Sequence, residues 1–268
     1  SVLMPKPKSP RIILWDIETT HNLAAVFQLK NQDYIQAENI VQERYIVCAA
    51  WKELGSKKVH AVSVLDDPKR YKRNPHDDYH VVSTLHKVLS EADVLVAHNG
   101  DEYDIKFTEG RMLVQGLPPL PTIPKIDTLK TARNRFLLNA NNLNYLGKLL
   151  KVGGKKPTKT GLWLKVLAGG KAGMKAIREM VSYNKGDVGL LEGVFLKLRP
   201  YIANHIHFQL FGGAGECPRC GSKHVQARGL HRATTQVYRR FQCQGCGGWF
   251  RRKQGEKAVA AKVHTRVL

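Results

Sequence analysis

RIILWDIETT (residues 11–20) is the stretch that decides the fold of this chain. Apolar side chains fill positions 12 to 15 without a break, and the run then meets Asp16 and, two positions later, Glu18. A short apolar run of this kind predicts a buried strand. Because alternate residues of a strand project from the same face, this strand ends in two carboxylates that share one face.

The rest of the chain continues from this strand as alternating strands and helices. RYIVCAAWKEL (44–54) and KKVHAVSVL (57–65) are rich in β-branched and aromatic residues and predict an antiparallel hairpin around Gly55-Ser56. Prolines exclude a helix over 117–124. The other expected elements are a strand over 93–99 and helices over 79–92, 103–115, 141–150 and 172–199. This order predicts a mixed α/β sheet flanked by helices.

The charge of the chain is unusual, although its composition is that of a soluble globular protein. The 268 residues are 43% hydrophobic, but Lys and Arg total 43 against 22 Asp and Glu, which gives a net charge of +21. A surface of that sign attracts polyanions, so nucleic acid is the expected partner. No apolar run is long enough to span a bilayer, and residues 1–10 lack the apolar core of a signal peptide. We therefore expect no membrane partner and a cytoplasmic location.

Composition also predicts where the chain divides. The glycine-rich stretch FGGAGE (211–216) precedes a segment of cysteine, arginine and aromatic residues. Residues 212–268 hold 12 Lys/Arg and 2 Asp/Glu, a net of +10, whereas the first 211 residues hold the remaining 31 and 20, a net of +11. We expect a loose tail over 1–10, a large α/β domain over 11–211 and a small basic domain over 212–268.

Three segments carry the candidate catalytic carboxylates. Asp16 and Glu18 repel each other unless a cation lies between them. Asp104 follows the second buried strand, and Asp187 lies four residues after Tyr183, so that both share one face of a helix. Four carboxylates brought together suit Mg²⁺ or Mn²⁺. Two such ions roughly 4 Å apart hydrolyse a phosphodiester by activating a water and stabilising the leaving oxygen.

The motifs WDIETT, HNGDEYD and YNKGD resemble the three exonuclease motifs of the DnaQ-like 3′–5′ exonucleases, and the tyrosine of the third is typical of one subclass. The second motif is most similar to that of the B-family DNA polymerase proofreading domain. The resemblance covers about residues 11–200 and implies a ribonuclease H-like fold with two catalytic Mg²⁺ or Mn²⁺ ions. It also implies that Tyr183 orients the attacking water and that the ions are held by Asp16, Glu18, Asp104 and Asp187.

Each motif taken alone has a structural alternative. An acidic pair at a strand end is often a solvated turn, and Asp104 is able to cap the helix that begins near it. Asp101 and Glu102 compete with Asp104 as ligands, but the spacing from Asn99 favours Asp104. We expect His98 and Asn99 to hold the strand-to-helix turn, and Asn99 is also a candidate contact to nucleic acid.

CPRCG (217–221) and CQGCG (243–247) contain two C-x-x-C pairs with 22 residues between them. Four thiolates at this spacing suit one tetrahedral, structural Zn²⁺ ion, and disulfides are the alternative. The pattern resembles a zinc ribbon, with VYRRFQC (237–243) as the strand leading into the second pair. Cys48 is expected to lie buried in a strand. The predicted zinc ligands are Cys217, Cys220, Cys243 and Cys246.

Arginine and aromatic residues surround these cysteines. The combination suits phosphate contact and base stacking on single strands, although the aromatic rings are also able to form the small core of a ribbon. The predicted nucleic-acid contacts are Arg228, Arg232, Arg239, Arg240, Trp249, Arg251 and Arg252. Lys155 and Lys156 belong to a lysine- and glycine-rich stretch, 151–165, which is expected to be a mobile loop. This loop either guides the strand into the site or simply links two elements.

The sequence thus predicts a metal-dependent 3′–5′ exonuclease with a C-terminal zinc ribbon that binds nucleic acid. DNA with a single-stranded 3′ end is the favoured substrate, and no small-molecule cofactor is expected. Two alternatives stay open. One is a ribonuclease H-like endonuclease that cuts branched or flapped DNA, and the other is a non-catalytic nucleic-acid-binding protein, against which the intact set of carboxylates argues.

Overall fold

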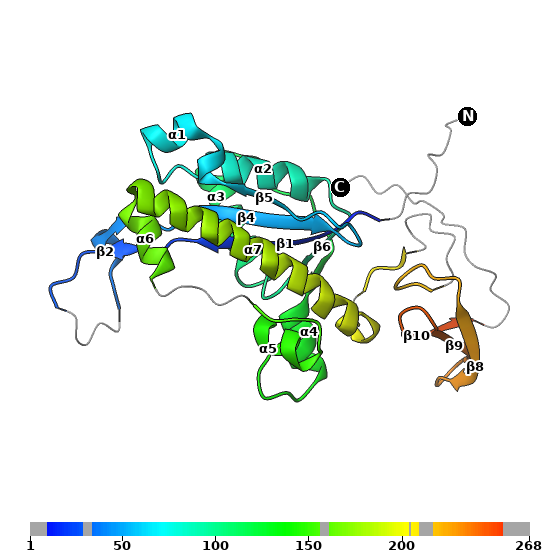
Figure 1. Ribbon diagram of the computed structural model, residues 1–268. Coiled ribbons are helices and arrows are strands. Elements are labelled where there is room, and N and C mark those ends of the chain that lie inside the picture. Colours follow the sequence, from blue (N-terminus) through cyan, green and yellow to red (C-terminus); the bar gives the residue numbers. More distant parts are fainter. Residues whose placement is uncertain (1–9, 29–33, 156–160, 204, 209–216, 254–268) are drawn as a thin grey trace, which may run out of the picture.

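The computed structural model describes residues 10–28, 34–155, 161–203, 205–208 and 217–253. Five strands form a mixed sheet in the order β5-β4-β1-β6-β7 with helices against it, and three more strands near the C-terminus form a separate antiparallel sheet (Figure 1). The predicted fold class is therefore confirmed: a mixed α/β sheet flanked by helices, with a small C-terminal unit built around four cysteines.

The elements follow one another in a simple order. The strands of the main sheet are β1 (Ile12–Thr19), β4 (Ile46–Glu53), β5 (His60–Ser63), β6 (Val94–Ala97) and β7 (Lys125–Asp127). The helices are α1 (Pro68–Arg73), α2 (Tyr79–Ser90), α3 (Asp104–Val114), α4 (Thr128–Arg135), α5 (Leu143–Leu149), α6 (Leu162–Ala168) and α7 (Gly170–Leu198). The short strands β2 (Leu23–Ala24) and β3 (Ile40–Gln42) pair with each other, and the C-terminal sheet consists of β8 (Val225–Arg232), β9 (Val237–Cys243) and β10 (Trp249–Lys253).

The central strand, β1, has two strand neighbours along only part of its length. It pairs antiparallel with β4 over Ile13–Thr19, but its parallel pairing with β6 covers only Ile12–Leu14. The segment that contains Asp16 and Glu18 therefore extends past the last residue pair with β6. This leaves room on that side for side chains from the segment that follows β6.

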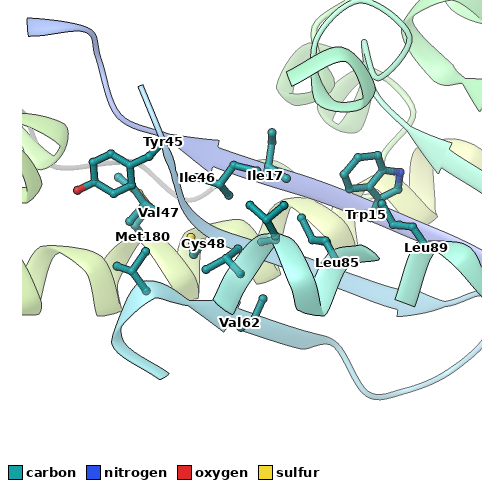
Figure 2. Packing of buried hydrophobic residues seen from close by; sticks show 14 of the residues in the cluster. Trp15, Ile17, Tyr45, Ile46, Val47, Cys48, Val62, Leu85, Leu89 and Met180 are labelled. Atoms are coloured by element: carbon teal, nitrogen blue, oxygen red, sulfur yellow. The ribbon is translucent and has the colours of Figure 1, made fainter. Parts of the chain in front are cut away.

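The side-chain alternation along β1 divides the core into two layers. Trp15 lies on the side of α2, where it packs near Leu89 (Figure 2). Leu14 lies on the opposite side, in a buried cluster that includes residues of α5 and α7. Alternate residues of a strand project from the same face, so Asp16 and Glu18 lie on the same face of β1 as Leu14. Both carboxylates therefore project toward α7.

Helix α7 is the longest helix, at 29 residues, and it crosses β1 and β4 (Figure 1). Its buried stripe includes Met180, Leu191 and Phe195, which are each 1% exposed or less. Its other faces carry lysines, as expected of an amphipathic helix that covers a sheet. In the described part of the chain, no helix is both long and apolar enough to cross a membrane.

The long elements lie where the sequence predicted them: the β4–β5 hairpin, β6, α2, α3, α5, α7 and β9. The prediction missed β7, α1 and α4, which are only three to eight residues long. The prediction of a loop over 151–165 is wrong at the C-terminal end of this stretch, because α6 begins at Leu162. The reason is packing, since Leu162 and Val166 are buried and α6 lies against α7.

The cysteine-rich unit contacts the chain just after α7. Arg199 donates from Nη2 to the carbonyl of Arg219 at 2.7 Å, and the N–H of Phe208 donates to the carbonyl of Pro218 at 2.7 Å. Arg219 in turn donates to the carbonyl of Ile202. The predicted domain boundary at 211/212 and the predicted tail up to residue 9 lie outside the described residues.

Candidate metal centres

Three carboxylates from two distant chain segments converge beside the end of β1. Asp16 and Glu18 project from β1 toward α7, and Asp187 lies on α7. One oxygen from each carboxylate lies within 4.8 Å of the other two. Oxygens that share one Mg²⁺ ion lie about 3 to 4 Å apart, given metal–oxygen distances of about 2.1 Å. Only a small movement of the side chains is needed for the three to hold a common ion.

Asp104, the fourth predicted ligand, is the first residue of α3. Its Oδ1 accepts a hydrogen bond from the N–H of Ile17 at 3.2 Å, on the part of β1 that extends past β6. Its charge is one of the causes that raise the pKa of Asp16, after burial. Asp104 therefore belongs to the electrostatic cluster, although it is not one of the three carboxylates that lie closest together.

The four carboxylates are difficult to ionise together. Burial, followed by the negative charges of Asp187 and Asp104, raises the pKa of Glu18 to about 8. Burial also raises the pKa of Asp104 to about 7, raises that of Asp187 and holds that of Asp16 well above its ordinary range. A bound divalent cation has the opposite effect, because its charge stabilises the ionised carboxylates. The cluster thus has the chemistry of a site for a hard, oxygen-preferring cation.

Lys155 supplies positive charge within this cluster. Its Nζ lies 2.5 Å from Asp187 Oδ2 and 3.1 Å from the Tyr183 hydroxyl. Burial disfavours the charged ammonium and by itself would lower the pKa of Lys155. The hydrogen bond to Asp187 and the negative charge of Asp187 have a larger combined effect, so the pKa of Lys155 is raised. Its backbone N–H donates to Asn144 Oδ1 at 3.0 Å, which fixes the chain at this point. The structure thus brings Lys155 next to the carboxylates, whereas Lys156 lies outside the described residues.

Helix α7 brings Tyr183 next to Asp187, as their four-residue spacing predicts, and both contact Lys155. Asn184 is a further residue of the cluster, which sequence reasoning missed. It is fully buried and donates from Nδ2 to Asp16 Oδ2 at 2.6 Å. A signal was available, because an amide on the buried stripe of a helix needs a hydrogen-bonding partner.

The turn between β6 and α3 is held by hydrogen bonds. Asn99 has a φ of +68°, and its N–H donates to Asp127 Oδ1 at 3.0 Å. Asp127, which sequence reasoning also missed, accepts from the N–H of Asp101 at 3.2 Å and caps α4. His98 Nδ1 lies 2.9 Å from the hydroxyl of Thr128. The expected role of His98 and Asn99 in the turn is therefore supported by direct contacts.

The four cysteines form the second candidate metal centre. Their sulfurs all lie within 4.8 Å of one another, with 3.8 Å between Cys217 and Cys246 and 3.6 Å between Cys220 and Cys243. Four sulfurs around one Zn²⁺ ion, each about 2.3 Å from it, lie about 3.8 Å apart. A disulfide requires about 2.05 Å. The spacing fits a zinc ion, and it does not fit the disulfide alternative.

Arg199 lies beside this thiol cluster and was not anticipated from the sequence. It is 7% exposed, and its guanidinium is 4.9 Å from the ring centre of Phe208. Burial lowers the pKa of Arg199, and the charges of the four cysteine thiols oppose this shift. If the four cysteines hold a zinc ion as thiolates, the centre has a net charge of −2, which the charge of Arg199 would partly balance.

The predicted nucleic-acid contacts of the C-terminal unit lie on its three-stranded sheet. All are exposed except Arg252, which is half-buried; the exposed residues are Arg228, Arg232, Arg239, Arg240, Trp249 and Arg251.

The fold and the two clusters define a mixed α/β protein with an acidic and a four-cysteine candidate metal centre. No family model matches the chain, and no curated protein matches it. Among solved structures, it is similar to the family B DNA polymerase from the hyperthermophilic archaeon Pyrobaculum calidifontis, with a TM-score of 0.49 and 15% identity. The match covers 73% of this chain and 26% of the polymerase chain, so this chain spans about a quarter of that chain's length.

Proposed function

We propose that this protein is a metal-dependent 3′–5′ exonuclease that hydrolyses phosphodiester bonds of nucleic acid. The observation that carries the proposal is the convergence of Asp16, Glu18 and Asp187, whose oxygens lie within 4.8 Å of one another. The net charge of +21 supports a polyanionic substrate. DNA with a single-stranded 3′ end is the substrate that the motifs favour.

Asp16, Glu18, Asp104 and Asp187 would hold two Mg²⁺ or Mn²⁺ ions, which would activate a water and stabilise the leaving oxygen. The protein prepares these carboxylates in advance. Asn184 holds Asp16, and the N–H of Ile17 holds Asp104. Such supporting hydrogen bonds fix the orientation of metal ligands before an ion arrives.

Tyr183 and Lys155 are the proposed groups that face the substrate. Burial raises the pKa of Tyr183, so its hydroxyl stays protonated near neutral pH and is able both to donate and to accept. This suits a group that orients a water. Lys155, 3.1 Å from that hydroxyl, offers an ammonium for a phosphate oxygen. Asn99, fixed in the turn after β6, is a further proposed contact.

The four cysteines are proposed to hold one structural Zn²⁺ ion. The proposed division of labour follows the charge of the chain, with residues 11–211 forming the catalytic domain and residues 212–268 forming a basic domain that binds nucleic acid. The zinc has no part in hydrolysis, because four protein ligands leave no open position for substrate.

The test is the digestion of a 5′-labelled single-stranded oligonucleotide with Mg²⁺. We expect a ladder of products that shorten from the 3′ end. Asp187→Asn, which removes a charge but keeps the shape of the side chain, should form these products about a hundredfold more slowly or not at all. A single internal cut in a flapped duplex would favour the endonuclease alternative, and intact oligonucleotide with bound protein would favour the non-catalytic one.

A further inference from the structure

The C-terminal sheet presents two faces of different character. Its central strand, β9, pairs with β10 so that Arg240 lies opposite Arg251 and Tyr238 lies opposite Lys253. Residues opposite each other in an antiparallel pair project from the same face. We call this face the outer face; on β9 and β10 its members are Tyr238, Arg240, Gln242, Trp249, Arg251 and Lys253. The inner face contains Arg239, Phe241, Phe250 and Arg252.

The inner face is the one that packs. The rings of Phe241 and Phe250 stack with centres 5.4 Å apart and an angle of 14° between their planes, and both rings are half-buried. The guanidinium of Arg252 lies 5.4 Å from each ring centre. The charge of Arg252 also contributes, after burial, to a lowered pKa of His207, which precedes the cysteines. The inner face therefore forms the small core of the unit and faces the preceding chain.

The outer face leaves its largest aromatic side chain uncovered. Trp249 is 47% exposed, although an indole in so small a unit would ordinarily be buried. The guanidinium of Arg240 lies 5.4 Å from the Trp249 ring centre, and that of Arg251 lies 4.5 Å from the Tyr238 ring centre. Arg240 Nε also donates to the carbonyl of Arg228 at 3.1 Å. Both guanidinium groups are thus held in place beside an aromatic ring.

The lysines and arginines of this unit are not balanced by any acidic residue within it. Residues 217–253 contain nine Lys and Arg and no Asp or Glu, a net of +9. A zinc ion bound by four thiolates contributes −2, which leaves +7. Fixed guanidinium groups match phosphate oxygens with little loss of side-chain freedom. An exposed indole is suited to stacking on a base, which is accessible for stacking when it is unpaired.

We propose that the outer face binds single-stranded nucleic acid, with Trp249 stacking on a base and Arg240 and Arg251 contacting the flanking phosphates. This surface is formed by other residues than the carboxylate site. The proposal rests on the nucleic-acid-binding part of the proposed function but not on hydrolysis, so the two are tested separately.

The test measures binding of the full chain to a fluorescent oligothymidylate of about 16 nucleotides, the upper range of site sizes for one small binding domain. Mg²⁺ and Mn²⁺ are omitted so that no cleavage occurs, and zinc content is measured for every variant. Trp249→Ala should weaken binding about tenfold or more, because it removes a stacking partner. Trp249→Phe should restore most of the affinity.

Arg239 and Arg240 provide a matched pair, since they are adjacent and exposed but lie on opposite faces. Arg240→Ala should weaken binding several times more than Arg239→Ala, although both remove one positive charge. If Trp249→Ala loses its zinc, the comparison of the two arginine variants still tests whether the outer face binds nucleic acid.

Equal losses in the two arginine variants would overturn the proposal, because they would mean that charge alone determines binding. Unchanged affinity in zinc-loaded Trp249→Ala would do the same. Equal affinity for a duplex of the same length would exclude base stacking. Competition by polyglutamate as strong as that by unlabelled oligothymidylate would show that the face recognises an acidic protein segment instead.

Discussion

The two candidate metal centres of this protein are built in opposite ways. The acidic centre joins side chains of β1 and α7, and Asn184 is 168 residues away from the Asp16 that it contacts. The thiol centre is made from two short turns within a unit of which 37 residues, 217–253, are described. The acidic centre is supported by two large buried layers on either side of the main sheet. The unit that contains the thiol centre has a small core of its own, in which Phe241 stacks on Phe250.

This difference indicates which of the two units needs a metal ion in order to fold. Around the acidic centre, Asn184, the N–H of Ile17 and Lys155 hold the carboxylates without a metal. We therefore expect the fold around the acidic centre to form without an ion. In the cysteine unit the described core is small, so we expect a bound zinc ion to supply free energy of folding that the core lacks.

The largest expected effect is the loss of the C-terminal sheet on removal of zinc. In Cys243→Ser we expect this sheet to unfold while the α/β part stays folded, because a structural zinc ion contributes about 10 kcal/mol or more to such units. Elemental analysis should find about one zinc per wild-type chain and none in the variant. Trypsin should then cut rapidly at the arginines of β9 and β10.

Cys48→Ala is the control, because Cys48 is fully buried in β4 and belongs to no cysteine cluster. It should keep its zinc and its protease resistance. Protease resistance of the C-terminal sheet in zinc-free Cys243→Ser would remove the proposed contrast between the two centres.

The next effect concerns the acidic centre, where substitution should stop chemistry but not folding. Asp187→Asn should lower the rate of 3′ digestion by about a hundredfold or more, because it removes a carboxylate charge needed to hold a cation that stabilises the transition state. Its affinity for oligonucleotide should change little, since binding depends on the basic surface. Digestion rates and binding curves measure the two separately.

Asp101→Asn is the matched control, because Asp101 lies near Asp104 in sequence but pairs with Lys130 at 3.5 Å. It should keep its activity. If Asp101→Asn were as inactive as Asp187→Asn, the choice of Asp104 as the ligand would be wrong.

A smaller effect should appear in the pH dependence of stability. The pKa of Glu18 rises from 4.5 to about 8, and that of Asp104 rises from 3.8 to about 7. Within these windows the folded protein binds protons that the unfolded chain has released. Without divalent ions, the free energy of unfolding should therefore decrease as the pH rises, until it levels off above about pH 8.

Thermal unfolding between about pH 6 and 8 measures this slope, since lower pH also releases zinc by protonating the thiols. Mg²⁺ should raise the unfolding temperature more at the upper end of the range, where more carboxylates are ionised. Glu18→Gln should flatten the slope. An unchanged slope in this variant would show that the acidic centre does not cause it.

The smallest effect is expected at Tyr183. Tyr183→Phe removes the hydroxyl that contacts Lys155 but leaves all four carboxylates. We expect a rate loss of about tenfold, smaller than that of Asp187→Asn, because a water is oriented less well while the ions stay bound. Side-by-side digestion rates test the ranking, and equal losses would mean that Tyr183 does more than orient water.

Much of the fold was predictable because its long strands and helices are long enough for the spacing of their apolar residues to show the type of element. The apolar run before Asp16 and the stripe of α2 are examples, and both lie where they were expected. The strand β7 has three residues, too few for an alternation to be visible, and its place in the sheet depends on pairing with β6. Such elements exist because a neighbour provides their hydrogen bonds.

The acidic centre shows the same limit. The carboxylates and Tyr183 could be named because their spacing within a strand or helix is local. The position of Asn184 on the buried stripe of α7 indicates that it needs a partner but not which one. Asn184 and Lys155 could not be assigned to the centre, because each contacts a carboxylate from another part of the chain, at 2.6 Å and 2.5 Å. Local spacing in a single sequence does not show which residues of different elements come into contact in the fold.

The hydrogen bond between Ile17 and Asp104 has a consequence for the choice of an inactive variant. Where β1 extends past β6, the N–H of Ile17 is buried, and Asp104 accepts its hydrogen bond. Replacing Asp104 with an apolar residue would leave this buried N–H without an acceptor, which costs about 1 to 3 kcal/mol, and would alter the metal site as well. For an inert but well-folded protein with which to crystallise a bound substrate, Asp187 is the better residue to change, because its partner Lys155 is partly exposed and able to reach water.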